Sequence, residues 1–301
     1  MLNMPETTPS QMNVQTAVVK QRANALFGVR FWQRVSTALA YGVVISATLV
    51  VILPLIWVLL TSLKSRVQAY SIPPVWFFTP TLENYLALLQ KYPFPLYFFN
   101  SALIAALTTA FALLIGTPAA YSFARFNTGG NFLRGWVLNN RTLPSVAVLI
   151  PFFMLAQALR LGNTYPALII AYLTFTLPFV IWMLTSFITS VPIEIEEAAL
   201  IDGATHLQAL RYVTIPLVAP GIAATGILSF LYSWNEFIFA LILTGNDTRT
   251  LPIAIANFLT QRGVEIGELS AATMTIIIPV IFLTFSVRGY LVRGLSFGGV
   301  K

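Results

Sequence analysis

Long apolar stretches separated by short polar segments make up most of this chain. An α-helix needs about 20 predominantly apolar residues to cross the hydrocarbon core of a membrane. The third of the long stretches is the least regular, because Asn139, Asn140 and Arg141 lie near its start. Six stretches are long enough, with bounds near residues 38–60, 98–124, 135–159, 166–188, 219–243 and 271–292. The pattern therefore predicts an all-α integral membrane protein with six transmembrane helices.

This pattern divides the chain into a transmembrane domain, residues 38–293, and two polar tails, residues 1–37 and 294–301. Only 9% of the 301 residues are charged, whereas soluble domains carry about 25%. A soluble globular enzyme is therefore excluded, and we expect a multi-pass protein of the cell membrane.

The basic residues predict the orientation. Most of the 17 Lys and Arg residues lie in segments that are cytoplasmic if the N-terminus is inside. The positive-inside rule then places both termini, and the segment between the fourth and fifth stretches, in the cytoplasm. The net charge of +7 is spread over the segment ends and forms no stripe, so membrane lipid, and not nucleic acid, is the expected partner.

Several kinds of chemistry are excluded by what the chain lacks. It contains no cysteine and one histidine, His206, so we predict no disulfide, no metal site and no catalytic residue. The phosphate-binding pattern G-x-x-x-x-G-K-[ST] is also absent. We therefore expect this chain to bind no cofactor, and any ATP and Mg²⁺ to be used by a separate subunit.

Residues 190–216, between the fourth and fifth stretches, carry the longest polar helical pattern. Pro192 suits the first turn of a helix, and acidic residues there complement the positive end of the helix dipole. Asp202-Gly203 is expected to end this first helix, because glycine readily adopts the left-handed conformation that closes one. The acidic residues that follow the proline are Glu194, Glu196 and Glu197.

A second short helix is predicted directly afterwards. Thr205 and Gln208 have the spacing of a capping box, in which each side chain pairs with the other residue's backbone N–H. Pro216 is expected to end this helix. The segment is thus predicted to be two short helices, joined by a glycine bend, between two apolar spans.

The fifth stretch carries a polar cluster, and Glu236 is its charged member. A charge at the centre of a bilayer costs about 2.5–3.5 kcal/mol on insertion scales, so Glu236 should face the bundle interior or an aqueous cavity. Tyr232 lies four residues earlier, on the same face of a continuous helix. The candidate translocation-pathway residues are Ser229, Tyr232, Ser233, Asn235 and Glu236. An aromatic ring beside hydroxyl and amide groups suits a sugar, but a hydrogen-bond network between helices is an equal alternative.

The run from Glu197 to Pro216 resembles the EAA loop of ABC-importer permeases: E-A-A, two residues, D-G-A, and a later apolar-x-x-apolar-x-apolar-Pro. The resemblance implies a cytoplasmic coupling helix that docks in a cleft of an ATPase subunit. An ordinary amphipathic interfacial helix is the alternative. The residues implied to form the coupling surface are Glu197, Ala198, Ala199, Asp202, Gly203 and Ala204.

Further motifs resemble the carbohydrate branch of that family, the second permease of a maltose-type heterodimer. They are Asn84-Tyr85, Asn100-Ser101, residues 233–237, residues 249–252 and residues 292–301. The resemblance implies a second permease, two ATPase subunits and an extracytoplasmic solute-binding protein as partners. It also implies that the last external loop contacts the binding protein through Asn257, Gln261, Arg262 and Glu265, although a simple solvated loop is as good a description.

We therefore expect a permease subunit of an ATP-driven importer for a di- or oligosaccharide or a related polyol. Movement of the loop 193–216 would tilt spans four and five and so switch the cavity from inward-facing to outward-facing. Another small polar solute is the first alternative. A secondary transporter would show more intramembrane acids and inverted repeats. A membrane-embedded enzyme would need its acids at one depth, yet four of the ten carboxylates lie in this loop.

Overall fold

The computed structural model describes residues 9–140, 144–256, 258–260 and 263–297. It divides into two compact units, residues 1–58 and residues 59–301. The helix α1 (Pro9–Ser62) forms the first unit as far as Val58, and its last four residues belong to the second; it begins inside the segment predicted as a tail. Its part from Val35 to Ser62 is long and apolar enough to cross a membrane, with a mean hydropathy of 2.8 in an 18-residue window.

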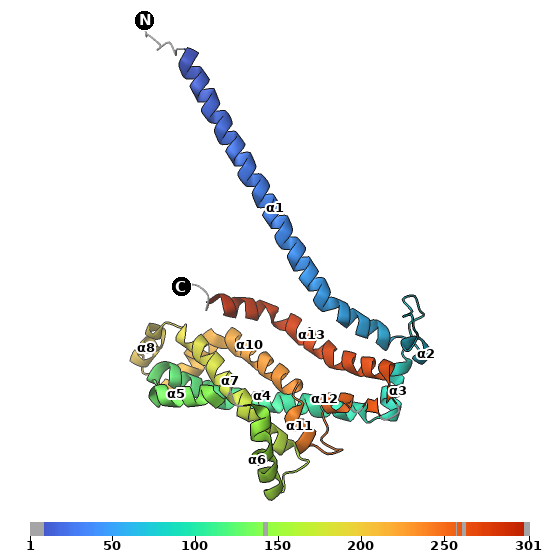
Figure 1. Cartoon of the computed structure of the whole chain (residues 1–301). Coiled ribbons are helices and arrows are strands. Elements are labelled where there is room, and N and C mark those ends of the chain that lie inside the picture. The colour runs from blue at the N-terminus through green and yellow to red at the C-terminus, as the bar shows by residue number, and fades with distance from the viewer. Residues whose placement is uncertain (1–8, 141–143, 257, 261–262, 298–301) are drawn as a thin grey trace. The chain divides into compact units, whose positions relative to one another are not determined.

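The second unit contains the remaining elements (Figure 1). Two short strands pair as an antiparallel hairpin, with Leu259 opposite Val264; the rest of the described chain is helical or loop. In chain order the elements are α2 (Arg66–Ala69), α3 (Glu83–Lys91), α4 (Phe94–Phe126), α5 (Gly130–Asn139), α6 (Ser145–Ala158), α7 (Tyr165–Thr189), α8 (Ile193–Ile201), α9 (His206–Ala209), the π-helical turn η2 (Leu210–Thr214), α10 (Ile215–Trp234), α11 (Ile238–Leu243), α12 (Leu251–Ala256), β1 (Leu259–Thr260), β2 (Gly263–Val264) and α13 (Ile266–Phe297).

The predicted fold class is confirmed, but the predicted third span is not one continuous helix, so the count of six spans is approximate. In the described part of the chain, five helical segments are long and apolar enough to cross a membrane. The stretch 135–159 is instead divided between α5, which ends at Asn139, and α6, which has only 14 residues. Pro144 precedes α6 with an extended ψ of 128°. This extended backbone at Pro144 interrupts the helix, and proline favours such a break because it has no N–H and restricts the residue before it.

The predicted bounds of the fifth span are also wrong. The helical run begins at His206 and ends at Trp234, and the chain leaves the helix before α11 begins at Ile238. Glu236 explains why a new helix, α11, begins at this point. Its carboxylate accepts the backbone N–H groups of Phe239 and Ala240, at 3.0 and 3.2 Å, and so pairs donors that a helix start leaves free.

Close packing of α4 against α7 forms the centre of the second unit, and α10 packs on both helices. A Cβ atom added to Gly116 of α4 would lie 2.6 Å from Val180 Cγ1 of α7. Ala120, one turn further on, is fully buried in the same cluster as Leu184 and Val218. The small residues therefore allow close approach of the helices, as is usual in membranes.

A buried amide side chain holds the loop between α11 and α12. Asn100 of α4 is fully buried, and its Nδ2 donates to the carbonyls of Asp247 and Arg249, both at 2.9 Å. The next side chain, Ser101, accepts the N–H of Leu251 at 2.8 Å. The Asn-Ser pair thus fixes the last long loop to the start of α4.

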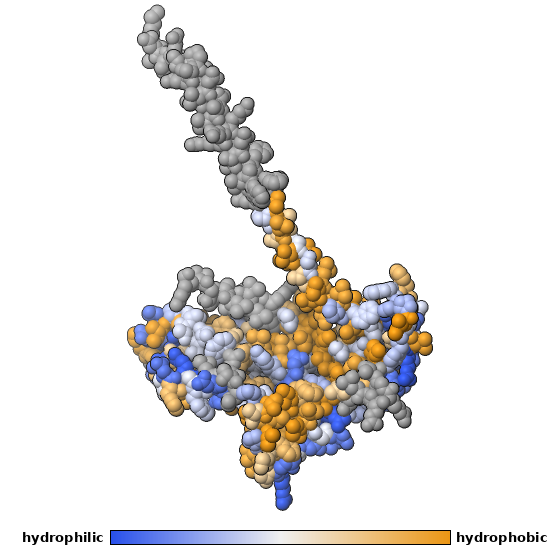
Figure 2. Space-filling model, viewed as in Figure 1, coloured by the Kyte–Doolittle hydropathy of each residue, from blue (hydrophilic) through white to orange (hydrophobic). Residues whose placement is uncertain are grey.

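The surface of the helices is largely apolar, as Figure 2 shows for the described residues. Large side chains such as Leu114, Ile150 and Phe282 are more than three-fifths exposed, at 71%, 66% and 70%. Exposed apolar surface of this extent marks contact with lipid or with other proteins.

We predict that Gly116→Leu destabilises the unit. The new side chain must displace Val180, and overpacking of this kind costs about 1–3 kcal/mol. Thermal unfolding of the purified protein in detergent should show a melting temperature several degrees lower. Gly135→Leu is the matched control, because no atom lies within 4 Å of a Cβ built there. Equal melting temperatures for the two variants would contradict the prediction.

Candidate functional site

The helix α8 is closed by local hydrogen bonds at its C-terminal end. It ends at Ile201, and Gly203 has a φ of +91°. The N–H of Gly203 donates to Leu200 O at 3.1 Å, and that of Ala204 donates to Ala199 O at 3.0 Å. This is the Schellman arrangement, in which a left-handed residue pairs the last free carbonyls. The predicted glycine stop is confirmed.

The predicted capping box at the start of α9 is also confirmed. Thr205 N–H donates to Gln208 Oε1 at 2.7 Å, and the N–H of Gln208 donates to Thr205 Oγ1 at 3.3 Å. We call the segment from Ile193 to Ala209, which includes α8 and α9, the α8–α9 hairpin. Its bend and both of its inner helix ends are therefore fixed by its own residues.

The predicted end of the second helix at Pro216 is wrong. The chain passes from α9 through the π turn directly into α10, as one helical run from His206 to Trp234. The N–H of Ile215 donates to Leu210 O, the wider bond of a π turn. Pro216 follows as the second residue of α10 and does not interrupt the run. The hairpin is thus joined to α10 with no flexible linker.

One face of the hairpin is open to solvent. Of the residues predicted to form the coupling surface, Glu197, Ala198, Asp202 and Gly203 are exposed, while Ala199 and Ala204 are half-buried. Ile201 and Leu207 add exposed apolar side chains, at 85% and 72%. Small and apolar residues together form the kind of surface that a partner protein covers; the coupling role itself stays a prediction.

The opposite side of α8 carries a buried carboxylate, Glu196, with a relative exposure of 3%. Arg125, near the end of α4, contacts it through Nη2 at 2.8 Å and through Nε at 3.0 Å to both oxygens. Tyr121 Oη donates to it at 3.0 Å and Thr214 Oγ1 at 2.9 Å. Arg125 Nη2 also donates to the carbonyl of Val191, at 2.9 Å.

These contacts determine the charge of Glu196. Burial alone would raise its pKa, but the hydrogen bonds from Arg125, Thr214 and Tyr121 outweigh burial and lower the pKa below its usual value. Sequence reasoning grouped Glu196 with its acidic neighbours and missed this role. The one available signal was Arg125, a lone positive charge at the end of an apolar stretch, but spacing alone could not pair the two residues.

The predicted pathway residues do not form one stripe on one helix. Ser229 and Ser233 of α10 are buried, at 0% and 4% exposure. Tyr232 is 53% exposed and meets the Phe179 ring of α7 edge to face, with centroids 5.1 Å apart. Because α10 ends at Trp234, the predicted common helical face of Tyr232 and Glu236 is wrong.

The two remaining pathway candidates lie beyond α10. Asn235 is exposed, and Glu236 is half-buried at the start of α11. Tyr232 and Asn235 are therefore the members of the cluster that are open to solvent. Their role in translocation stays a prediction.

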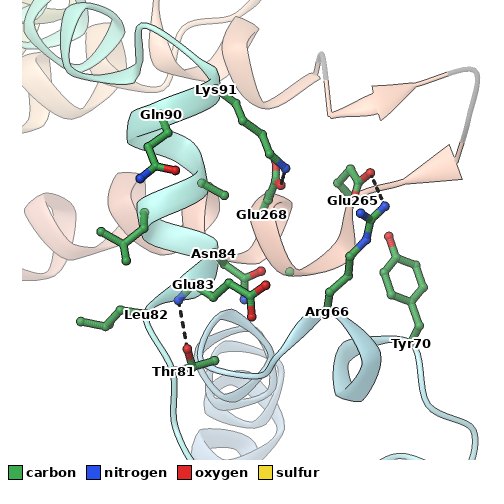
Figure 3. A pocket seen from close by; sticks show the side chains of 13 residues that line it. Arg66, Tyr70, Thr81, Leu82, Glu83, Asn84, Gln90, Lys91, Glu265 and Glu268 are labelled. Carbon is green, nitrogen blue, oxygen red and sulfur yellow. Dashed lines mark hydrogen bonds and ion pairs between the residues drawn. The ribbon is translucent and has the colours of Figure 1, made fainter.

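At the end of α4 opposite the hairpin, α2, α3 and the start of α13 surround a polar pocket of about 510 Å³ (Figure 3). Glu265, a predicted contact residue, lines it and pairs with Arg66 at 2.9 Å. Lys91 reaches Glu268 across the same pocket. The hydrogen bond that Lys91 donates to the Glu268 carboxylate raises the pKa of Lys91. Three other predicted contact residues, Asn257, Gln261 and Arg262, lie outside the described residues.

Comparison with known proteins gives a consistent result. A family model described as "binding-protein-dependent transport system inner membrane component" matches residues 112–297. The sulfoquinovosyl glycerol transport system permease protein SmoH of Agrobacterium fabrum is 39% identical over 82% of this chain and 88% of that protein. The trehalose transport system permease protein SugB of Mycobacterium tuberculosis is 37% identical over 83% and 92%.

A solved structure supports the same fold. A chain of a bacterial ABC transporter for the import of the acidic polysaccharide alginate superposes with a TM-score of 0.66 and 20% identity, covering 95% of this chain and 99% of that one. At this identity the likeness shows the fold, while the family model and the sequence relatives show descent. Together they establish that the chain belongs to the family of binding-protein-dependent transport system inner membrane components.

Proposed function

We propose that this chain is one permease subunit of an ATP-driven importer for a di- or oligosaccharide or a related polyol. It would form half of a translocation pathway with a second permease and would dock on one of two ATPase subunits. An extracytoplasmic solute-binding protein would supply the solute. The names of the relatives at 37–39% identity, which refer to trehalose and to sulfoquinovosyl glycerol, support this class of solute.

The observation that carries the proposal is the α8–α9 hairpin. Its open face presents Glu197, Ala198, Asp202 and Gly203, with exposed Ile201 beside them. No phosphate-binding motif is present in the sequence, so ATP and Mg²⁺ would act in the partner. A displacement of the docked hairpin would pass into α10 without loss, because the π turn makes the two continuous.

The pathway would use the exposed members of the polar cluster. The ring of Tyr232 can cover the apolar face of a sugar, and the amide of Asn235 can pair with its hydroxyl groups. Both are solvent-exposed at the C-terminal end of α10. Ser229, Ser233 and Glu236 would contribute if α10 moves during the cycle.

The polar pocket at the other end of α4 is the proposed place of contact with the solute-binding protein. Glu265 lines it, and Arg66 beside it has a side chain that is 67% exposed. Asn257, Gln261 and Arg262 belong to the same loop. A second solved alginate transporter, which superposes with a TM-score of 0.64 and 16% identity, is in complex with a periplasmic protein that holds an alginate pentasaccharide.

The coupling role predicts the effect of a bulky residue on the open face of the hairpin. Ala198→Trp should weaken binding of the ATPase roughly 10- to 100-fold, because overpacking an interface costs about 1–3 kcal/mol. Co-purification of the ATPase with the affinity-tagged permease pair measures this. Ala158→Trp, at an exposed alanine of α6, is the matched control. Full retention of the ATPase by Ala198→Trp would refute the docking surface.

The proposed orientation predicts opposite labelling of two sites. The natural chain has no cysteine, so a single introduced thiol is labelled without background. Asp202→Cys, on the hairpin, should react with a membrane-impermeant maleimide only in inside-out vesicles. Asp247→Cys, on an exposed part of the last outer loop, should react only in right-side-out spheroplasts. Labelling of Asp202→Cys from outside would reverse the orientation.

The pathway role predicts that Tyr232→Ala lowers sugar uptake at limiting concentration roughly 2- to 10-fold, since an aromatic contact is worth about 0.5–1.5 kcal/mol. Tyr232→Phe keeps the ring and should retain most of the uptake. Radiolabelled uptake into proteoliposomes that contain the full complex is the measurement, with ATPase co-purification unchanged. An alanine variant that transports like the natural protein would remove Tyr232 from the pathway.

A further inference from the structure

The buried carboxylate Glu196 joins segments that are far apart in the chain. Its partners Tyr121 and Arg125 lie in the last turns of α4, and Thr214 lies at the end of η2. Arg125 additionally holds the Val191 carbonyl, in the connection between α7 and α8. We call Glu196, Arg125, Tyr121 and Thr214 the Glu196 cluster.

The hairpin does not need this cluster to form its own shape. The Schellman arrangement at Gly203 and the capping box at Thr205 are made of residues within the hairpin. A buried ion pair is also a weak source of stability, because the cost of removing two charges from water offsets much of the attraction. What a bidentate arginine–carboxylate contact adds is direction, since the planar fork accepts one orientation.

The cluster ties the hairpin to the longest packed helix of the second unit. The helix α4 has 33 residues and spans about 50 Å at 1.5 Å per residue. Near its other end, Asn100 and Ser101 hold the outer loop through Asp247, Arg249 and Leu251. A rigid link between the hairpin and α4 therefore connects the two ends of this unit through one element.

We infer that Glu196 is a positioning residue that joins the α8–α9 hairpin to α4 as one rigid lever. A displacement received at the hairpin then moves α4 together with α10, and through Asn100 it moves the outer loop. This inference rests on the proposed function and adds α4 to the moving parts, which sequence reasoning confined to spans four and five. Glu196 itself touches neither nucleotide nor solute; it acts through Arg125.

The first experiment measures coupling. Glu196→Gln keeps the size of the side chain and removes its charge, so the arginine fork loses its anionic partner. In proteoliposomes with the full complex, the amount of solute transported per ATP hydrolysed should fall about 5-fold or more, the low end of typical coupling between sites. ATPase co-purification and basal hydrolysis should stay at the level of the natural complex. Glu194→Gln is the matched control, because Glu194 is an exposed acid of the same helix and should couple normally.

Two milder variants keep the test decisive if Glu196→Gln does not assemble. Tyr121→Phe and Thr214→Val each remove one hydrogen bond to Glu196 and leave the ion pair. Each should lower the amount of solute transported per ATP hydrolysed by less than Glu196→Gln does. The double variant should lower it by more than either single variant. Normal coupling in Glu196→Gln, or in the double variant if the glutamine variant fails to assemble, would overturn the inference.

The second experiment measures directly whether the hairpin and α4 move as one rigid body. Spin labels on cysteines at Thr128, just after α4, and at Asp202, on the hairpin, should give one narrow distance distribution, unchanged between nucleotide-free and nucleotide-trapped complexes. Glu196→Gln should broaden it, while Glu194→Gln should not. A distance in the natural sequence that changes with nucleotide would show that the hairpin moves independently of α4. Because the distribution can also be recorded on the purified chain alone, failure of the lever is distinguishable from failure of ATP-driven transport.

Discussion

In the hydrocarbon core no water is available to pair with backbone N–H and C=O groups, so each of them must find its partner within the protein. This constraint forces α4, α7, α10 and α13 into long helices and limits where they can break. Two of these helix ends show where the partners come from. The Glu236 carboxylate accepts the first free N–H groups of α11, and the guanidinium of Arg134 donates to the carbonyl of Phe123 near the end of α4. Threonine hydroxyls such as that of Thr225 donate to a carbonyl one turn earlier in the same helix.

The features that sequence reasoning predicted correctly are local. The apolar lengths of α4 and α7, the glycine stop at Gly203 and the capping box at Thr205 each depend on residues within one or two turns. The failures are non-local. Hydropathy averaged over residues 135–159 hides the separation of α5 from α6. The sequence around Glu236 is the same whether this acid lines a helix face or starts a new helix. The acids Glu194, Glu196 and Glu197 lie within four residues, and the position of Arg125 on α4 decides which of them is buried.

The buried asparagine of α4 shows a different limit. The pair Asn100-Ser101 could be noticed through resemblance, but its role needs the loop before α12, which lies about 150 residues later in the chain. An amide suits this position because its two donors serve two carbonyls, and its oxygen accepts the Tyr165 hydroxyl at 2.8 Å. A hydroxyl or an acid could not serve two carbonyls in this way. The residue type is therefore dictated by a loop backbone that no local pattern reveals.

The α8–α9 hairpin combines these two kinds of constraint on opposite sides of one short helix. The proposed docking role requires the hairpin to hold its shape, keep its direction and pass on displacement, and each requirement has its own physical basis in the structure. Local caps at Gly203 and Thr205 hold the shape. The ion pair of Glu196 sets the direction, and the π turn removes the linker that would absorb movement. A hairpin without the ion pair would keep its shape and its open face, yet it could rotate relative to α4. Glu196 is the one buried acid of the hairpin and lies three residues before Ala199. Its position therefore decides whether a displacement of the hairpin also moves α4 or only changes the docked surface.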